Sequence, residues 1–144
     1  MSAVIILDAS AVIAFLQREP GHEAVEQALQ SDRCVVSVAN QSEIISKALD
    51  RGVTPDAIVS ILAELSYVVL DLKVEDGVQA GLMRLSTRSA GLSLGDRLCL
   101  ATAQRLQAQV VTADRAWLSV AETLGLDIQC VRAGAHGGSK PSSL

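Results

Sequence analysis

Short runs of apolar residues alternate along the chain with longer stretches in which apolar residues recur at helical spacing. The runs are rich in β-branched side chains and too short for helices, so each indicates a buried strand. Five of them are expected to be strands: 4–8, 34–38, 67–71, 109–113 and 127–131. Strands without regular polar alternation are typical of a parallel sheet that is covered on both faces.

The stretches between these runs carry the end signals of helices. Thr54 before Pro55 is a preferred helix start, and Ser93 with Asp96 has the pattern of a reciprocal capping pair. Asn40 is expected to cap its helix in the same way. Helices are therefore expected to begin near residues 9, 22, 40, 55, 75, 94 and 115. Strands that alternate with helices predict an α/β/α sandwich with a central, mostly parallel, five-stranded sheet.

Length and composition indicate a single domain. The chain has 144 residues, of which 49% are hydrophobic, and this is enough to form a core. It contains one Phe, one Trp and one Tyr, so stacking of bases on aromatic side chains is a poor candidate for a binding mode. Residues 1–132 are expected to form the domain, and the apolar-poor segment 133–144 is expected to be a disordered tail.

Cysteine usage and hydropathy predict a cytoplasmic protein. Cys34, Cys99 and Cys130 lie in apolar runs without metal-ligand spacing, which is typical of buried thiols in a reducing compartment. No apolar run approaches the ~20 residues of a membrane-spanning helix, and the start of the chain lacks the basic region of a signal peptide.

The charge of the chain does not favour a nucleic-acid partner. Twelve Lys and Arg against sixteen Asp and Glu give a net charge of −4, whereas proteins that bind nucleic acids usually carry a basic surplus. If four of the acids bind metal, the remaining charges balance. That weakens the objection without removing it.

Four acidic residues fall where ligands bind in such a fold, beyond the carboxyl ends of parallel strands. They are Asp8, Glu43, Asp96 and Asp114, which end predicted strands or begin predicted helices. Acids are also favoured at helix starts as caps. Spacing does not separate the two roles, because Asp71, Glu75 and Asp76 lie at similar positions. The pattern by itself predicts an acidic edge.

Converging carboxylates would suit Mg²⁺ or Mn²⁺, which can align water and stabilise a leaving oxygen. Ser10 lies two residues after Asp8, and Thr112 lies two residues before Asp114. Their hydroxyls suit the placing of water, although local capping explains them as well. Arg97 and Arg115 directly follow two of the acids, so each is a candidate for phosphate binding, for pairing with an acid or for a solvated surface position.

Four short motifs resemble those of the PIN-domain ribonucleases, specifically the VapC toxins of bacterial toxin–antitoxin modules. They are Leu-Asp-Ala-Ser at 7–10, Ser-Glu at 42–43, Leu-Gly-Asp-Arg at 94–97 and Val-Thr-Ala-Asp at 111–114. The resemblance covers residues 4 to 131, and four motifs in this order at predicted strand ends and helix starts are specific. It implies a PIN-like fold.

The same resemblance implies a function, partners and a site. The function is a Mg²⁺- or Mn²⁺-dependent endoribonuclease, the toxin of a type II toxin–antitoxin system. The implied partners are RNA, a second copy of the chain, and a cognate VapB-type antitoxin in a heterotetramer or larger assembly. Asn40 is a weaker site candidate. The implied metal ligands are Asp8, Glu43, Asp96 and Asp114, and Ser10 and Thr112 complete the implied catalytic residues.

Two other functions stay open at this point. One is a PIN-type nuclease that acts in RNA processing or on structured DNA. The other is a receiver-like phosphoacceptor module with Asp71 as acceptor. It fits poorly, because Asp8 is preceded by Leu7 rather than by an acid, and because Arg132 stands where a lysine would be needed.

Overall fold

A computed structural model describes residues 4–132 and 135–137, which contain one six-stranded sheet in the order β3-β2-β1-β4-β5-β6. Five of its strands are parallel, as predicted, and the antiparallel β6 adds a strand that the sequence did not suggest. The strands are β1 (Ile5–Leu7), β2 (Cys34–Ser37), β3 (Tyr67–Leu70), β4 (Gln109–Thr112), β5 (Ile128–Cys130) and β6 (Ala135–Gly137). β6 lies within the segment expected to be disordered, and residues 133–134 and 138–144 lie outside the described residues.

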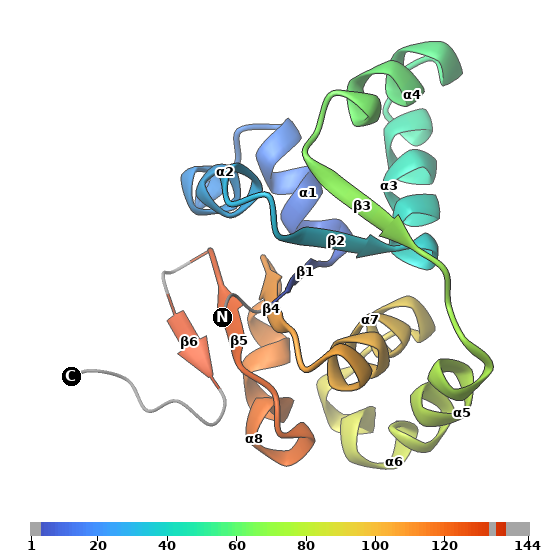
Figure 1. Ribbon diagram of the computed structural model, residues 1–144, viewed down its shortest axis with the longest axis vertical. Coiled ribbons are helices and arrows are strands. Elements are labelled where there is room, and N and C mark those ends of the chain that lie inside the picture. Colours follow the sequence, from blue (N-terminus) through green and yellow to red (C-terminus); the bar gives the residue numbers. More distant parts are fainter. Residues whose placement is uncertain (1–3, 133–134, 138–144) are drawn as a thin grey trace.

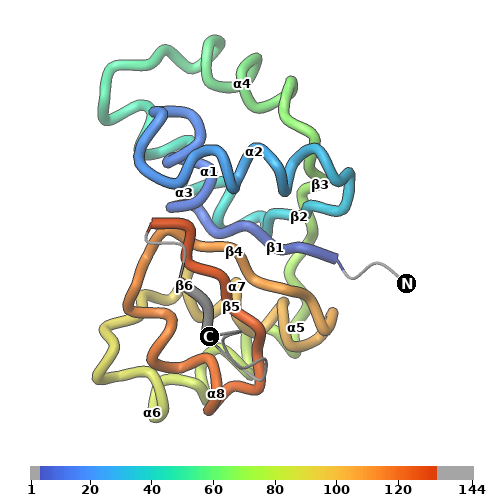
Figure 2. The backbone as a smooth tube through the Cα atoms, turned by 90° about the vertical axis from the view of Figure 1, so that its left-hand side faces the viewer, coloured from blue at the N-terminus to red at the C-terminus, as the bar shows by residue number. Residues whose placement is uncertain are grey.

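Helices cover both faces of the sheet (Figure 1). The first group is α1 (Ala9–Leu16), α2 (His22–Gln30), α3 (Val38–Asp50) and α4 (Pro55–Ala63). The second group is α5 (Val74–Leu82), α6 (Arg84–Thr87), η1 (Arg88–Ala90), α7 (Leu94–Leu106), η2 (Arg115–Val120) and α8 (Ala121–Leu124). Figure 2 shows the two groups from the side, with β1 running between them.

Two hydrophobic cores result, one on each face of the sheet. Ile5 and Leu7 of β1 belong to the core beneath α1–α4, whereas Ile6 belongs to the core beneath α5–α8. This division follows from the alternation of side chains along a strand. The predicted α/β/α sandwich is confirmed, and the three cysteines are buried and free, as expected.

Three helices differ from the prediction. α3 begins at Val38, because Ser37 Oγ rather than Asn40 accepts the capping N–H bond, which comes from Asn40 itself at 3.1 Å. The helix expected over 75–88 divides into α5, α6 and η1. At this division Ser86 and Thr87 donate their hydroxyls to the carbonyl of Met83, which also accepts from the N–H of Thr87 at 3.0 Å. The helix expected over 115–124 is the 3₁₀ segment η2 followed by α8.

The predicted cap of α7 is present and matters for the site. Ser93 Oγ accepts from the N–H of Asp96 at 3.1 Å, and a carboxylate oxygen of Asp96 accepts from the N–H of Ser93 at 3.0 Å. This reciprocal pair fixes the first turn of α7, from which Asp96 projects. None of the helices in the described part of the chain has the length and apolar character that crossing a membrane requires.

Candidate active site

The site is built where β1 and β4 lie side by side. Leu7 is paired with Val111 in the register of these strands, so Asp8 and Thr112 leave the sheet at the same level. Asp8 is 3% exposed and caps α1, because its Oδ1 accepts from the N–H of Ala11 at 2.9 Å. The turn from β1 into α1 therefore holds this carboxylate inside the protein.

Two hydroxyls fix the Asp8 carboxylate. Ser10 Oγ lies 2.9 and 2.8 Å from its two oxygens, and Thr112 Oγ1 donates to Oδ2 at 2.8 Å. The same hydroxyls accept from the chain after β4: Ser10 Oγ from the N–H of Ala113 at 2.9 Å, and Thr112 Oγ1 from the N–H of Asp114 at 3.0 Å. Ser10 and Thr112 thus connect the first acid to the loop that carries the last one.

Burial gives Asp8 an unusual affinity for protons. It raises the pKa of Asp8 from 3.8 to about 7, against the lowering effect of the bonds from Ala11, Thr112 and Ser10. The nearby charge of Asp96 raises this pKa further. A carboxyl group with such a pKa is present in both protonation states near neutral pH.

Asp96 is close enough to Asp8 and to Asp114 for their charges to interact. Burial raises its pKa, the capping bonds from Ser93 lower it, and the charge of Asp114 raises it again. The ammonium group of Lys47 acts in the opposite direction. Asp114 itself is exposed, and its Oδ1 accepts from the N–H of Ala116 at 3.0 Å.

Glu43 comes to the same place from α3. Its Oε1 accepts from Asn40 Nδ2 at 2.7 Å, and its carboxylate lies against Gly95 in the first turn of α7. Burial raises the pKa of the Cys99 thiol, and the charges of Asp8, Asp96 and Glu43 raise it further. The structure therefore brings together all four acids singled out in the sequence, from four separate segments.

The donor set fits a hard divalent cation that is held partly through water. As placed, no three His, Cys, Asp or Glu side chains among residues 4–132 converge closely enough to bind one ion directly. Mg²⁺ usually keeps several waters and takes only one or two protein carboxylates, so spaced oxygen donors suit it. Burial is the main cause of the raised pKa of Asp8 and of Asp96, and the charge of a neighbouring acid adds to it. A bound cation would offset both effects.

The model of the PIN-domain family matches residues 5–123. The chain belongs to the PIN-domain family. PIN domains are nucleases, which gives this protein a hydrolase role. A search of curated proteins found no match.

Solved structures with the same fold come from bacterial toxin–antitoxin complexes. DNA-bound VapBC from Salmonella typhimurium is 19% identical with a TM-score of 0.71, over 90% of this chain and 99% of that chain. VapBC-1 from nontypeable Haemophilus influenzae is 22% identical with a TM-score of 0.67, over 89% and 98%. A toxin–antitoxin complex from Klebsiella pneumoniae is 18% identical with a TM-score of 0.58, over 78% and 86%. At these identities the likeness establishes the shared fold.

The two arginines next to site acids have different surroundings in this PIN domain. Arg97 is 9% exposed, and its Nη1 donates to the carbonyl of Ala80 at 2.8 Å, so it joins α7 to α5. That contact replaces the expectation that it binds phosphate or pairs with an acid. Arg115 is exposed beside Asp114 and stays a candidate for phosphate binding.

The competing acids are separated from the site. Asp76 is buried and forms a two-bond ion pair with Arg105, at 2.8 and 2.9 Å. Asp71 follows the edge strand β3, two strands away from β1, and is exposed. Strand order therefore makes the distinction that spacing did not.

Sequence reasoning missed two residues of the PIN-domain site, Lys47 and Gly95. Lys47 lies four residues after Glu43 in α3, so helical periodicity already placed the two on one face. Gly95 had no comparable signal, because its contact with Glu43 joins two helices.

Proposed function

We propose that this PIN domain is a Mg²⁺- or Mn²⁺-dependent endoribonuclease, the toxin of a type II toxin–antitoxin system. The observation that carries the proposal is the gathering of four carboxylates from β1, α3, α7 and the end of β4, with the first of them buried and held by two hydroxyls. A structural capping role explains each acid separately but does not require them to share one place.

The site residues have distinct roles in this proposal. Asp8, Glu43, Asp96 and Asp114 would hold the metal, partly through bridging water, and the bound metal would polarise the phosphate and lower the pKa of water. Ser10 and Thr112 keep the Asp8 carboxylate in one orientation. A site carboxylate would accept the proton of the attacking water. Arg115 at the rim is placed to contact a backbone phosphate.

RNA is the proposed substrate on the strength of the VapC-like motifs. Single-stranded or loop RNA is favoured, because an unpaired strand can fit a phosphodiester into a site with a buried acid. No contact in the described residues favours RNA processing or structured DNA instead. The receiver-like alternative loses its basis, since Asp71 lies apart from the other acids.

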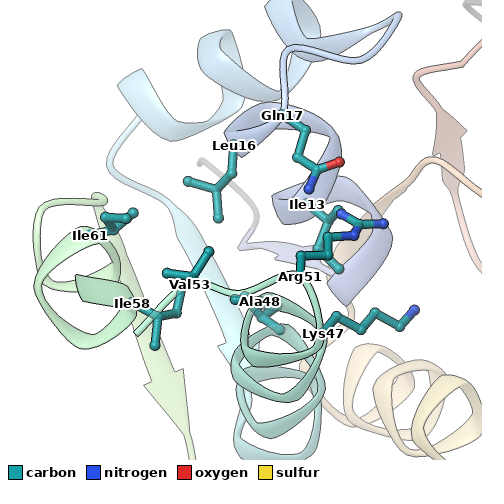
Figure 3. A pocket seen from close by; sticks show the side chains of 10 residues that line it. Ile13, Leu16, Gln17, Lys47, Ala48, Arg51, Val53, Ile58 and Ile61 are labelled. Atoms are coloured by element: carbon teal, nitrogen blue, oxygen red, sulfur yellow. The ribbon is translucent and has the colours of Figure 1, made fainter. Parts of the chain in front are cut away.

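An apolar pocket next to the site is the proposed seat of a VapB-type antitoxin. The pocket has a volume of about 270 Å³ between α1, α3 and α4 and is floored by aliphatic side chains, with Lys47 and Arg51 at its side (Figure 3). The charge of Lys47 reaches Asp96, so the pocket adjoins the acids. An antitoxin segment with apolar residues for the floor and acidic residues for these cations would cover the site. We propose that the complex acts in the cytoplasm.

A homodimer is proposed from exposed apolar side chains on the other side of the molecule. Val74 and Leu85, at the two ends of the α5–α6 pair, are 87% and 81% exposed, and Val78 and Leu82 between them are also exposed. Val68 on the adjoining edge strand β3 is exposed as well. A surface of this kind is typical of an interface, and two such copies with their antitoxins would give a heterotetramer or larger assembly.

The proposed activity is tested with purified protein and one hairpin sequence made as RNA and as DNA. We expect cleavage of the RNA loop with Mg²⁺ or Mn²⁺ and none with EDTA. Asp96→Asn keeps an oxygen for capping but removes a charge, so its cleavage should be nearly lost. Asp71→Asn is the matched control and should cleave like the parent. Cleavage that persists in EDTA contradicts the metal site, and preferred cleavage of DNA contradicts the substrate.

A further inference from the structure

The carboxylate of Glu43 is held by a buried amide whose own hydrogen bonding is incomplete. Asn40, one helical turn earlier in α3, donates from Nδ2 to Oε1 of Glu43 at 2.7 Å. Asn40 is fully buried, and its Oδ1 has no hydrogen-bond partner among the described residues. A buried acceptor without a partner is destabilising. The fold therefore keeps Asn40 at this position despite the cost of its unpartnered Oδ1.

Gly95 lies on the other side of the same carboxylate. A Cβ at Gly95 would lie 2.7 Å from Oε1, 2.8 Å from Cδ and 2.9 Å from Oε2 of Glu43. These distances are well inside van der Waals contact. No side chain fits at position 95 while Glu43 keeps its place. Since the carboxylate is the mobile end of a long side chain, a Cβ would move the carboxylate and leave both helices where they are.

The backbone of α7 does not require glycine at this position. Gly95 is in the first turn of a regular helix and is not among the residues with positive φ. Alanine is more favourable than glycine in such a place. Gly77 and Gly81 in α5 provide the comparison, because a Cβ at either would meet nothing within 4 Å.

We propose that Asn40 and Gly95 are positioning residues that hold the Glu43 carboxylate against the first turn of α7, the turn that carries Asp96. Asn40 fixes it from α3 by a hydrogen bond, and Gly95 admits it against α7 by having no side chain. Neither residue touches substrate; both act through Glu43. This inference rests on the proposed function, because it gives the positioning of Glu43 a purpose in binding the cation.

The test compares Gly95→Ala with Gly81→Ala in the full chain, using Mn²⁺ as probe. Binding is measured from the electron paramagnetic resonance signal of free Mn²⁺, and stability from thermal unfolding in EDTA. Gly95→Ala is expected to unfold at the same or a higher temperature without metal, because alanine favours the helix. Its affinity for Mn²⁺ should fall 10–100-fold, as is usual when a partner of a metal ligand is changed. Gly81→Ala should bind like the parent.

A double-mutant comparison shows whether Gly95 acts through Glu43. In a Glu43→Ala background the carboxylate is gone, so Gly95→Ala should cause no further loss of Mn²⁺ affinity. Asn40→Leu, which removes the donor and keeps the branching of the side chain, should lower the affinity in the parent and not in Glu43→Ala.

The failures are distinguishable. If the parent protein binds no Mn²⁺, both the proposed function and the positioning role of Asn40 and Gly95 are overturned. If the parent binds Mn²⁺ no better than Gly95→Ala does, only the positioning role is overturned. The positioning role is also overturned if Gly95→Ala lowers the Mn²⁺ affinity of Glu43→Ala as much as it lowers that of the parent. In that case Gly95 acts on α7 directly and not through Glu43.

Discussion

Thr112 Oγ1 donates to Asp8 Oδ2 at 2.8 Å and accepts from the N–H of Asp114 at 3.0 Å. One hydroxyl therefore connects the acid that follows β1 to the acid that follows β4. In the sequence Thr112 resembles an ordinary β-branched strand residue, yet in the structure it orients one proposed metal ligand and the backbone of another.

Thr112→Val tests this connection, because it keeps the shape of the side chain and removes only the hydroxyl. Asp8 then loses a donor and the N–H of Asp114 loses an acceptor in a buried place. We expect a loss of about 1–3 kcal/mol in the free energy of unfolding and a further rise in the pKa of Asp8. Urea unfolding measures the first, and Thr112→Ser, which keeps the hydroxyl, is the control. Equal stability of Thr112→Val and the parent would contradict the connection.

Asp8→Asn is expected to stabilise the metal-free protein at alkaline pH. The pKa of Asp8 is about 7 in the folded state and 3.8 as its ordinary value, so the folded state binds the extra proton between these values. The contribution of Asp8 to the free energy of unfolding is therefore fully present below pH 4 and is lost as the pH rises through 7. The variant avoids this loss, which is at most about 4 kcal/mol.

Unfolding in urea with EDTA at pH 5 and pH 8 measures this effect. The advantage of Asp8→Asn should be largest at pH 8 and smaller at pH 5. Asp71→Asn, at an exposed acid, should show no such dependence. An advantage that is the same at both pH values would mean that the pKa of Asp8 is ordinary.

Metal binding should depend on pH for the same reason. Below pH 7 a cation must displace the proton of Asp8, so the affinity for Mn²⁺ should rise up to about tenfold per pH unit and level off above pH 7. Calorimetry in two buffers of different ionisation enthalpy would count the released proton. Binding that is independent of pH between 5.5 and 7 would remove Asp8 from the ligands.

The ion pair of Asp76 with Arg105 should support the fold without touching the site. Arg105→Met leaves the Asp76 charge, which is 1% exposed, without its partner. Because Arg105 itself is 23% exposed and solvent reaches the pair, we expect a loss of about 1–3 kcal/mol in the free energy of unfolding. The bond from Arg105 lowers the pKa of Asp76, so the contribution of this group is present at neutral pH and is lost as the pH falls below 4. In acid unfolding, the stability of Arg105→Met should therefore fall less steeply with pH than that of the parent. A variant as stable as the parent would refute the structural role.

Arg115→Ala and Arg97→Ala should separate phosphate contact from packing. Arg115→Ala is expected to reduce the slope of log affinity against log salt for an RNA strand by about 1, with unchanged stability. Arg97→Ala should leave the slope unchanged and lower stability, by about 1–3 kcal/mol, because the carbonyl of Ala80 loses its donor. If the two variants show the reverse pattern, the assignments are exchanged.

The sequence was sufficient for the elements that have a strong local cause. The β-branched runs predicted all five parallel strands, and the Ser93–Asp96 pair predicted the start of α7. The division of α5 from α6 was not predictable in this way. It coincides with two hydroxyl bonds to Met83, and periodicity carries no information about such bonds.

The candidate site shows the same limit at the level of topology. Asp8, Asp71 and Asp114 are equivalent in the sequence, since each follows an apolar run. Only the strand order places β1 beside β4 and puts β3 at the edge. The sequence left the role of Arg97 open, because a residue that follows an acid at a helix start can face either a neighbouring helix or solvent.

The burial of Asp8 decides what survivors of a toxicity selection would look like. If expression of the protein stops growth, cells escape through any change that inactivates it, and most such changes disrupt the fold. Replacement of Asp8 by Asn removes the charge that the interior resists. The single amide oxygen can still accept from the N–H of Ala11, with the amide nitrogen facing Thr112 Oγ1. Among the surviving clones, those altered at Asp8 would accumulate intact, soluble protein that can still bind an antitoxin. In cells that also carry an active copy, this inactive protein would compete with the active copy for the antitoxin.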